Sequence, residues 1–449
     1  MAQLPKKQIH RILVANRGEI AVRIIRTCKE MGIETVAVYS TADRDSLHVK
    51  LANQAICIGP PPSSKSYLVR ENLIMAALNT GCEALHPGVG FLSENSGFAA
   101  LVREKGLVFI GPEAETIELL GDKVHARSTA ERFGLPITPG TREAVDSGGA
   151  LEAAKTLGFP VIIKAAAGGG GKGMRVVHRA EDLAENLNIA VAEAKSNFAD
   201  GRVFIERYLE NPRHVELQLL SDGKGKVSIL GERDCSVQKN HQKLIEESPS
   251  PGVNDEMREL MIRGASSLFR ELKYVGAGTI EFLVEDSHFY FMEVNARVQV
   301  EHPVSEFVTG VDIIRQQILA CAGEDMEIQD GALPSSGWAV ECRINAASPG
   351  NITRLDIPGG PGVRFDSFLH TGCTVPPHYD SMVAKLIVHA GTRVQALAKM
   401  NRALEELNIE GLTTNKTQQQ WIVNNKIFQS GNFGTSYYNT VAGELEHVK

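Results

Sequence analysis

The sequence lacks the features of membrane, secreted and zinc-ribbon proteins. No apolar run in its 449 residues approaches the length of about 18 that a transmembrane helix needs, so we expect no membrane association. The first residues, Met1 to Lys7, contain no hydrophobic segment of a secretory signal, and we expect a cytoplasmic protein. The seven cysteines form no Cys-x-x-Cys pair, which favours buried thiols over disulfides or a zinc site.

An excess of positive charge is also absent. The chain carries 47 lysines and arginines against 54 aspartates and glutamates, a net charge of −7. This balance argues against a nucleic-acid coat, and we expect no nucleic-acid partner, but it leaves room for a local cationic pocket that binds a phosphate ligand. With a hydrophobic content of 43%, a chain of this length can form large cores, and we expect two to four domains.

The first third of the chain lacks a glycine-rich dinucleotide fingerprint, although its elements alternate in the right order. The elements expected there are a strand over 12–15, a helix over 18–29, and strands over 35–39, 84–86 and 107–110. Alternation of this kind predicts a parallel, doubly wound sheet whose domain closes near residue 120. The first strand-to-helix turn, Asn16-Arg17-Gly18-Glu19, has a single glycine, so a dinucleotide site there is poorly supported.

Glycines are instead concentrated between residues 168 and 173, where five of six residues are glycine and the other is Lys172. The run lies between the expected strands 160–165 and 175–177, so a hairpin flap is favoured over a phosphate loop, which would need a helix after the last glycine. Such a flap can place backbone N–H groups on phosphates. The alternative is a mobile hairpin tip without a ligand, but Lys164 and Lys172 on either side favour the flap.

Polar and apolar residues alternate strictly from Glu293 to Glu301. This period of two predicts a strand with five charged or amide groups on one face. Those groups are Glu293, Asn295, Arg297, Gln299 and Glu301. The alternative is a half-buried strand whose outer face is only solvated.

The segments 279–284 and 288–293 read as a hairpin joined through Asp286-Ser287. If the turn centres on Ser287, Glu281 lies opposite Glu293, and two opposed carboxylates are stable only with a cation between them. Asn295 is one strand step further on the same face, and oxygen ligands of this kind suit Mg²⁺ or Mn²⁺. A register slip of one residue would separate the pair.

Two other stretches carry charge. The segment 232–243 is dense in charged and amide residues, a composition that usually marks solvated surface. The segment 338–345 alternates again, with Ala339, Glu341 and Arg343 on one side. Turn-rich residues at 358–362 and 375–380 predict a third, mixed domain of short strands and closing helices.

Several motifs, in order along the chain, resemble those of one enzyme family. The motifs are Ala15-Asn16-Arg17-Gly18-Glu19-Ile20-Ala21, His86-Pro87-Gly88, Gly90-Phe91-Leu92-Ser93-Glu94-Asn95, Gly121-Asp122-Lys123, the glycine flap, and the segments 206–215, 232–247, 293–303 and 339–345. Over nearly its full length the chain resembles biotin carboxylase, a member of the ATP-grasp superfamily.

The resemblance implies an α/β fold with the three-part ATP-grasp architecture. The parts would be an N-terminal doubly wound domain over 1–121, an ATP-grasp domain over 122–325 with a mobile lid at roughly 138–208, and a C-terminal mixed α+β domain over 326–449.

The resemblance also implies the site residues. For ATP they are Lys123 and Lys164 at the phosphates, Gly170 and Gly171 in the lid, Glu206, Arg207, Tyr208 and Leu209 at the adenine, and His214, Gln238 and His241, with Glu281, Glu293 and Asn295 as ligands of Mg²⁺ or Mn²⁺. Bicarbonate would be bound by Lys243, Arg297, Gln299 and the backbone of Val300, with Glu301 as its base, and Arg343 would stabilise the biotin enolate.

The implied reaction is ATP-dependent carboxylation of biotin by bicarbonate, through carboxyphosphate. No Met-Lys-Met biotinylation signal occurs near the C-terminus, so we expect a separate biotin carboxyl carrier protein and carboxyltransferase subunits as partners. The expected pathway is the first half-reaction of acetyl-CoA carboxylase in fatty acid synthesis, with pyruvate or another acyl-CoA carboxylase as the alternative. The family's dimer contacts correspond to Arg26, Glu30 and Arg364, and a homodimer is expected.

Two other functions stay open at this stage. One is a different ATP-grasp ligase, such as a carbamoyl phosphate synthetase-like half, and the other is a nucleotide-sensing remnant. The sequence departs from the family pattern at Val89, where an aromatic residue is usual, at Pro361, where Phe is usual, and in a shortened loop from Asn345 to Gly350. We therefore expect one flat wall of the biotin site to be missing.

Overall fold

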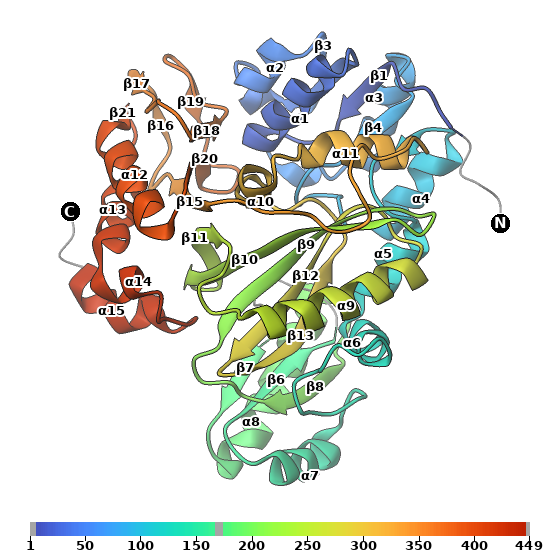
Figure 1. The fold of residues 1–449 in the computed structure, drawn as a ribbon. Helices are drawn as coiled ribbons and strands as arrows, with labels where there is room; N and C mark the ends of the chain where they lie inside the picture. The colour runs from blue at the N-terminus through green and yellow to red at the C-terminus, as the bar shows by residue number, and fades with distance from the viewer. Residues whose placement is uncertain (1–5, 167–173, 446–449) are drawn as a thin grey trace.

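The computed structural model describes residues 6–166 and 174–445. Its N-terminal part contains a five-stranded parallel sheet in the order β3-β2-β1-β4-β5. Helices cover it (Figure 1, blue). The elements are β1 (Arg11–Val14), α1 (Gly18–Glu30), β2 (Glu34–Ser40), α2 (Leu47–Leu51), β3 (Gln54–Gly59), α3 (Arg70–Asn79), β4 (Ala84–His86), α4 (Ser96–Glu104), β5 (Val108–Phe109) and α5 (Ala114–Gly121). The predicted parallel sheet is confirmed.

The strand order of this sheet reverses between β1 and β4, and ligand crevices of open α/β sheets form at such switch points. The loops after the two strands are tied together there, because the Asn16 amide donates to the carbonyls of Pro87 and Val89 at 2.7 and 2.8 Å. Gly88 has φ +66°, and a Cβ on it would lie 2.8 Å from that amide nitrogen. The glycine is therefore required for the two loops to meet.

A nine-stranded sheet forms the centre of the molecule, in the order β13-β12-β9-β10-β11-β15-β20-β18, with β14 beside β10. Its strands are β9 (Arg213–Asp222), β10 (Val227–Lys239), β11 (Gln242–Ser248), β12 (Val275–Glu285), β13 (His288–Asn295), β14 (Gly331–Ala332), β15 (Trp338–Asn345), β18 (Val363–Ser367) and β20 (Met382–Ala390). The helices of this part are α6 (Lys123–Arg132), α9 (Asp255–Glu271), α10 (His302–Thr309) and α11 (Ile313–Cys321). Because β11 pairs with β15, this sheet contains strands from both sides of the predicted domain boundary between residues 325 and 326.

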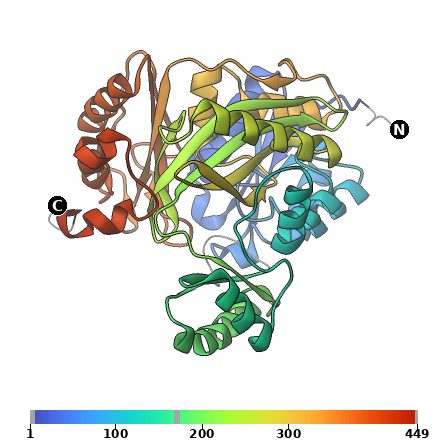
Figure 2. The ribbon, with the colours of Figure 1, turned by 60° about the horizontal axis from the view of Figure 1, so that its bottom comes forward.

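A small unit stands apart at the bottom of the molecule (Figures 1 and 2). It contains the sheet β7-β6-β8 and two helices around its own apolar core. The elements are α7 (Ser147–Leu157), β6 (Val161–Ala165), β7 (Met174–Val177), α8 (Leu183–Phe198) and β8 (Val203–Arg207). Antiparallel pairing of β6 with β7 confirms the predicted hairpin. The glycine flap itself, with Gly170, Gly171 and Lys172, lies outside the described residues.

The C-terminal part adds short strands and helices to the end of the large sheet (Figure 1, orange and red). They are β16 (Gly350–Asn351), β17 (Arg354–Asp356), β19 (Thr374–Val375), α12 (Arg393–Glu406), β21 (Asn408–Glu410), α13 (Lys416–Asn424), α14 (Lys426–Ser430) and α15 (Tyr437–Leu445). This agrees with the predicted mixture of short strands and closing helices. The cysteines are free thiols, and Cys57 is the exposed one. Over the described residues, no helix has the length and apolar character to cross a membrane.

The predicted pairing of Glu281 with Glu293 is correct, but the turn is not centred on Ser287. Near the turn Glu285 pairs with His288, so the turn residues are Asp286 and Ser287. A β-bulge between Phe291 and Glu293 then shifts the register by one residue. The extra residue, Met292, thus brings Glu293 opposite Glu281.

The predicted strand from Glu293 to Glu301 is wrong beyond Asn295, where β13 ends. The Ala296 N–H donates to Glu94 Oε1 at 3.0 Å, so the backbone leaves the sheet and turns toward the N-terminal part. Glu301 already lies at the start of α10, where Pro303 favours the first helical turn. The alternation therefore marks a strand end and a folded loop.

Candidate active site

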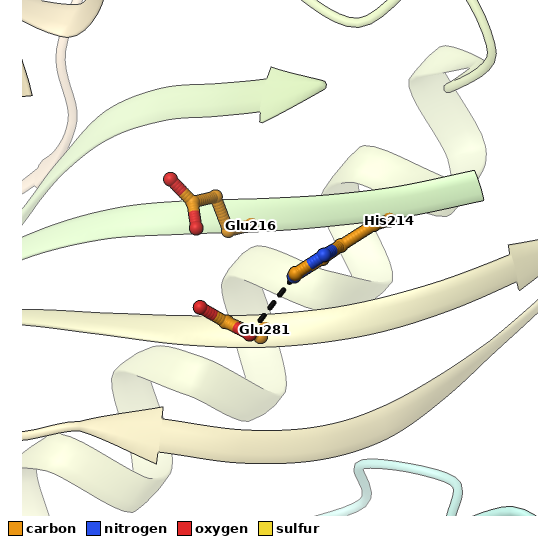
Figure 3. Close-up of side chains that lie close together, drawn as sticks. All are labelled: His214, Glu216 and Glu281. Atoms are coloured by element: carbon orange, nitrogen blue, oxygen red, sulfur yellow. Dashed lines mark hydrogen bonds and ion pairs between the residues drawn. The ribbon is translucent and has the colours of Figure 1, made fainter. Parts of the chain in front are cut away.

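A cluster of buried charged side chains lies where the large sheet meets the loop 296–301. The loop brings Glu301 toward residues that project from β9, β11 and β12. Figure 3 shows one side of the cluster, with His214 and Glu216 on one strand and Glu281 on the next. Buried charges are stable only when they are paired, so the ion pairs define this site.

Lys243 is the centre of the cluster. Its ammonium nitrogen lies 2.7 Å from Glu216 Oε2, 3.2 Å from Glu281 Oε1 and 2.5 Å from Glu301 Oε1. Burial alone would lower the pKa of Lys243, but the Cys235 thiol and these carboxylates raise the pKa well above its ordinary value. Lys243 is therefore a fixed cation that joins three carboxylates.

His214, Glu216 and Glu281 offer metal-ligand atoms within 4.8 Å of one another, and the dashed line in Figure 3 marks the 2.8 Å contact from His214 Nε2 to Glu281. Because Lys243 already lies against both carboxylates, this triad is neutralised by protein groups. Gln238 Nε2 lies 2.6 Å from the other ring nitrogen of His214. Burial would lower the pKa of His214, but Glu281 outweighs it and the pKa is raised.

Glu301 is completely buried and bound by cations on both carboxylate oxygens. Lys243 contacts Oε1, and Arg343 Nη2 donates to Oε2 at 2.9 Å. Burial would raise the pKa of Glu301, but Lys243 and Arg343 lower it well below the usual range. In this arrangement Glu301 is a carboxylate with little basicity.

The Arg297 guanidinium hydrogen-bonds to side chains that would lie further from it along a continuous strand. It donates to Glu94 Oε2 at 2.8 Å, to Gln299 Oε1 at 2.9 Å and to Asn295 Oδ1 at 3.0 Å. The predicted strand that carries all five polar groups in a row on one face is therefore wrong beyond Asn295. The folded loop instead concentrates Asn295, Arg297, Gln299 and Glu301 around Lys243 and Glu281.

A second cationic group lies between the sheet and the small unit. Lys164 Nζ lies 2.5 Å from Glu206 Oε2, and the other oxygen of Glu206 pairs with Arg127. Lys123 Nζ lies 3.2 Å from Glu293 Oε2. Three basic side chains thus face two carboxylates. Burial, together with the charges of Lys123 and Arg127, lowers the pKa of Lys164 to about 7. This excess of positive charge suits an anionic ligand.

The opposed carboxylates of Glu281 and Glu293 are compatible with a divalent metal. They pair across β12 and β13, with Asn295 next on the strand, so every donor is an oxygen. The Asn295 amide nitrogen donates to Glu281 at 2.9 Å. Burial would raise the pKa of Glu281, but the nearby charges of Lys243 and His214 outweigh it and lower the pKa. A permanently ionised Glu281 fits the role of a metal ligand.

A cavity of about 460 Å³ lies beside the cluster, at the switch point of the N-terminal sheet. Its lining includes Arg343, Val300 and Val89. Although Val89 is not aromatic, Phe91, Phe368 and Tyr379 also line the cavity, and the Arg17 guanidinium stacks 4.1 Å above the Tyr379 ring. The cavity therefore keeps flat walls on its other sides.

Not every predicted residue is in contact with the cluster. Arg207 is the last residue of β8 and donates to the Tyr290 hydroxyl at 3.1 Å, and Tyr208 and Leu209 follow the strand. His241 is exposed in the turn between β10 and β11 with φ +64°, and no hydrogen bond of its side chain occurs among the described residues.

The structure also reveals residues that the sequence reasoning missed. These are Glu94, Glu216, Arg233 and Glu246. Arg233 has no exposed surface, and it donates to Glu216, to Gln218 at 2.6 Å and to Ser305 at 3.0 Å. Residues 232–237 of the predicted surface segment 232–243 are therefore buried, with their charges paired, whereas residues 239–242 are exposed. The period-two order of His214, Glu216 and Gln218 was the signal that could have identified β9.

Three family models match the chain. They describe the biotin carboxylase N-terminal domain over residues 8–117, the ATP-binding domain of the carbamoyl-phosphate synthase L chain over 122–329, and the biotin carboxylase C-terminal domain over 341–440.

Similar proteins and structures cover the whole length of the chain. Biotin carboxylase of Haemophilus influenzae is 48% identical over 98% of this chain and 100% of that protein, and the chloroplastic biotin carboxylase of Arabidopsis thaliana is 46% identical over 95% and 81%. The Campylobacter jejuni biotin carboxylase structure has a TM-score of 0.94 at 44% identity, covering 96% and 99% of the chains. The biotin carboxylase domain dimer of Hydrogenobacter thermophilus 2-oxoglutarate carboxylase, in complex with MgADP, ADP and bicarbonate, has a TM-score of 0.94 at 42% identity, covering 99% and 100%.

Replacing Arg233 with methionine should destabilise the protein by roughly 3–5 kcal/mol, because Glu216 loses a buried partner. Urea denaturation measures this loss. The double variant Arg233→Met/Glu216→Gln should recover part of the stability. Arg315→Met, which breaks an exposed pair with Glu327, is the control and should cost about 1 kcal/mol or less. An equal effect of the two single substitutions would contradict the role of Arg233.

Proposed function

The chain belongs to the biotin carboxylase family, and from this premise we propose how its buried charge cluster carries out the family's reaction. It is a ligase that uses ATP and bicarbonate to carboxylate biotin. The observation that carries the proposal is the contact of Lys243 with both Glu281 and Glu301. One cation thereby connects the proposed metal ligand with the proposed base.

The cationic group around Lys164 is proposed to bind the ATP phosphates. Lys123 and Lys164 would contact phosphate oxygens, and residues 206–209, at the end of β8 and just after it, would bind the adenine. A divalent metal held by Glu281, Glu293 and Asn295 would supply further positive charge at the phosphates. Fixed cations of this kind stabilise charge that develops on a transferring phosphoryl group. His214 and Gln238 would hold Glu281 in place.

Bicarbonate is proposed to bind between Lys243, Arg297, Gln299 and the backbone of Val300. An oxygen of bicarbonate would attack the γ-phosphorus of ATP, with ADP as the leaving group, while Glu301 takes the bicarbonate proton. Glu301 is too weak a base while Lys243 and Arg343 both hold it. Bicarbonate, as an anion, would share these cations, and the pKa of Glu301 would rise as it does so.

The 460 Å³ cavity is the proposed place of the biotin ring. Carboxyphosphate would break down there to CO₂ and phosphate, and the phosphate would take the N1 proton of biotin. Arg343 lines this cavity and would stabilise the enolate oxygen, since a guanidinium keeps its charge at any working pH. Closure of the lid would exclude water from carboxyphosphate.

The partners and the domain boundaries are proposed as well. We infer a separate carrier protein and carboxyltransferase subunits, and three domains over 1–121, 122–325 and 326–449, a division that the ranges of the family models support. A homodimer is supported by the related domain described as a dimer. Arg26 and Glu30 are exposed on α1, whereas Arg364 pairs with Glu306 and Asp366 of its own chain.

Acetyl-CoA is the proposed final acceptor, in a cytoplasmic carboxylase of fatty acid synthesis. Pyruvate is the second candidate, because the biotin carboxylase subunit of a pyruvate carboxylase matches with 42% identity and a TM-score of 0.84. Purification of the complex and identification of its carboxyltransferase would decide between them.

The purified protein should hydrolyse ATP slowly with bicarbonate and faster when free biotin is added. Glu301→Gln should lower the biotin-dependent rate by about 10²–10⁴-fold, because the proton acceptor is lost. Arg297→Ala should also remove the biotin-dependent part. The measurement is a coupled assay of ADP release.

Glu327→Gln is the matched control, since Glu327 is half exposed and pairs with Arg315 away from the cluster. Its biotin-dependent rate should equal that of the unmodified protein. A well-folded, unmodified protein without any response to biotin would refute the proposed reaction.

Binding of ADP at pH 8 should take up close to one proton per site. Lys164 is mostly neutral at that pH because its pKa is about 7, and an adjacent phosphate raises the pKa so that a proton is bound. Calorimetry in buffers of different ionisation enthalpy measures the uptake. Lys164→Arg, which is always charged, should show none, and equal uptake by both proteins would contradict the assignment.

A further inference from the structure

The guanidinium of Arg343 is held by two carboxylates from different parts of the fold. Its Nε donates to Glu246 Oε1 at 2.6 Å, and its Nη2 donates to Glu301 Oε2 at 2.9 Å. Glu246 lies on β11 within the sheet, whereas Glu301 lies in the loop before α10. One partner is therefore fixed, and the other takes part in the proposed proton transfer.

Glu341 is a buried carboxyl group that the proposed reaction does not use. It lies two residues before Arg343 on β15, directly opposite Glu246 in the β11–β15 ladder. Its side chain has no exposed surface, and neither of its oxygens has a hydrogen-bond partner among the described residues. Glu246 Oε2 is unpartnered in the same way.

The surroundings of Glu341 do not support a negative charge. Ile387 lies opposite it on β20, and Val304 and Val308 of α10 join Ile387 in an apolar cluster. The nearby ammonium of Lys385 already pairs with Glu19 at 3.0 Å and donates to the Val300 carbonyl at 2.7 Å. Two adjacent buried carboxylates cannot both ionise easily, so the pair needs a proton.

The ionisable groups around the pair come from seven elements or loops. They are Lys243 on β11, Cys235 on β10, Cys342 and Arg343 on β15, Lys385 on β20, Glu301 before α10, and Glu19 of α1 and Asp366 of β18, which both face Lys385. Burial raises the pKa of Glu246 to about 7 and that of Glu341 well above its ordinary value. Above about pH 7, Glu246 is therefore ionised and the proton resides on Glu341.

We propose that Glu246 and Glu341 are a proton-sharing pair of positioning residues that hold Arg343 in place for the biotin enolate. Neutral Glu341 donates its O–H toward the free oxygen of Glu246, and ionised Glu246 anchors Nε of Arg343. The inference rests on the proposed function of Arg343.

The pair becomes important when Glu301 accepts the bicarbonate proton. Neutral Glu301 no longer attracts the guanidinium, so Nη2 gives up its 2.9 Å bond to Glu301 in favour of the enolate oxygen, while Glu246 Oε1, which lies 2.6 Å from Nε and 2.5 Å from Nη2, still anchors the group. The proton moves only from bicarbonate to Glu301, and the pair keeps its own. Proton transfer in the first step thereby frees the cation that the second step needs.

The decisive variant is Glu246→Gln. It should raise KM for free biotin at least 10-fold relative to the unmodified protein. In the unmodified protein, kcat/KM for biotin should fall as the pH drops through about 7, because Glu246 gains a proton and holds Arg343 less firmly. Glu246→Gln should lack this acid limb. Steady-state ATP hydrolysis with varied biotin between pH 6 and 9 measures both effects.

Glu247→Gln is the matched control, one residue further along β11, where Glu247 pairs with Arg393 and Trp338 instead. It should leave the biotin KM and the acid limb unchanged. Glu341→Gln keeps a neutral hydrogen-bond donor and should preserve the limb. Glu341→Leu removes the donor and should shift the limb to higher pH.

The outcomes separate this inference from the proposed function. An unchanged biotin KM and acid limb in Glu246→Gln would overturn the positioning role while leaving the carboxylase reaction intact. If Glu246→Gln does not fold, the Glu341 variants decide, and identical pH profiles for Glu341→Gln and Glu341→Leu would overturn the pair. An unmodified protein without a biotin response would refute the proposed function, and this inference with it.

Discussion

The ammonium group of Lys243, placed among three carboxylates, is the interaction on which the site depends. It joins β11 to β9 and β12 and holds the loop 296–301 against the sheet. Without it, Glu216, Glu281 and Glu301 would repel one another in a buried space that cannot stabilise their charges. The same contacts keep Glu281 ionised, as a metal ligand requires, and keep Glu301 nearly without basicity. In the proposed reaction, one cation therefore couples metal and phosphate binding to the proton transfer.

The second constraint is that the loop 296–301 is held from outside the sheet as well. Glu94 of the N-terminal part binds both the Ala296 N–H and Arg297. Lys385 of β20 donates to the Val300 carbonyl. Lys385 in turn pairs with Glu19 of α1. The loop can take its folded shape only when all three parts of the chain are assembled. This explains why the proposed bicarbonate site and the cavity meet at one place.

The sequence was sufficient for the features that have a regular period. The parallel N-terminal sheet was predicted from the alternation of strands and helices, the β6–β7 hairpin from glycines between two strands, and the opposition of Glu281 and Glu293 from a hairpin register. The structure confirms all three. The bulge at Met292 was missed because its signal is only a one-residue change of phase, in which the buried positions Phe289 and Phe291 are followed by Val294. The end of β13 at Asn295 was missed for a related reason, since the N–H of Ala296 pairs with Glu94, about 200 residues earlier in the chain.

Residues that act by holding others were also out of reach of the sequence. Glu216, Arg233 and Glu246 lie on strands as charged residues, and in sequence a paired buried charge looks the same as an exposed one. Only the partner distinguishes them, and the partners come from other strands or from α10. Buried ion pairs are costly to assemble and costly to break. With so many buried ion pairs, the geometry of the site should change little until a substrate brings charges of its own. Bicarbonate and the phosphates of ATP are such substrates.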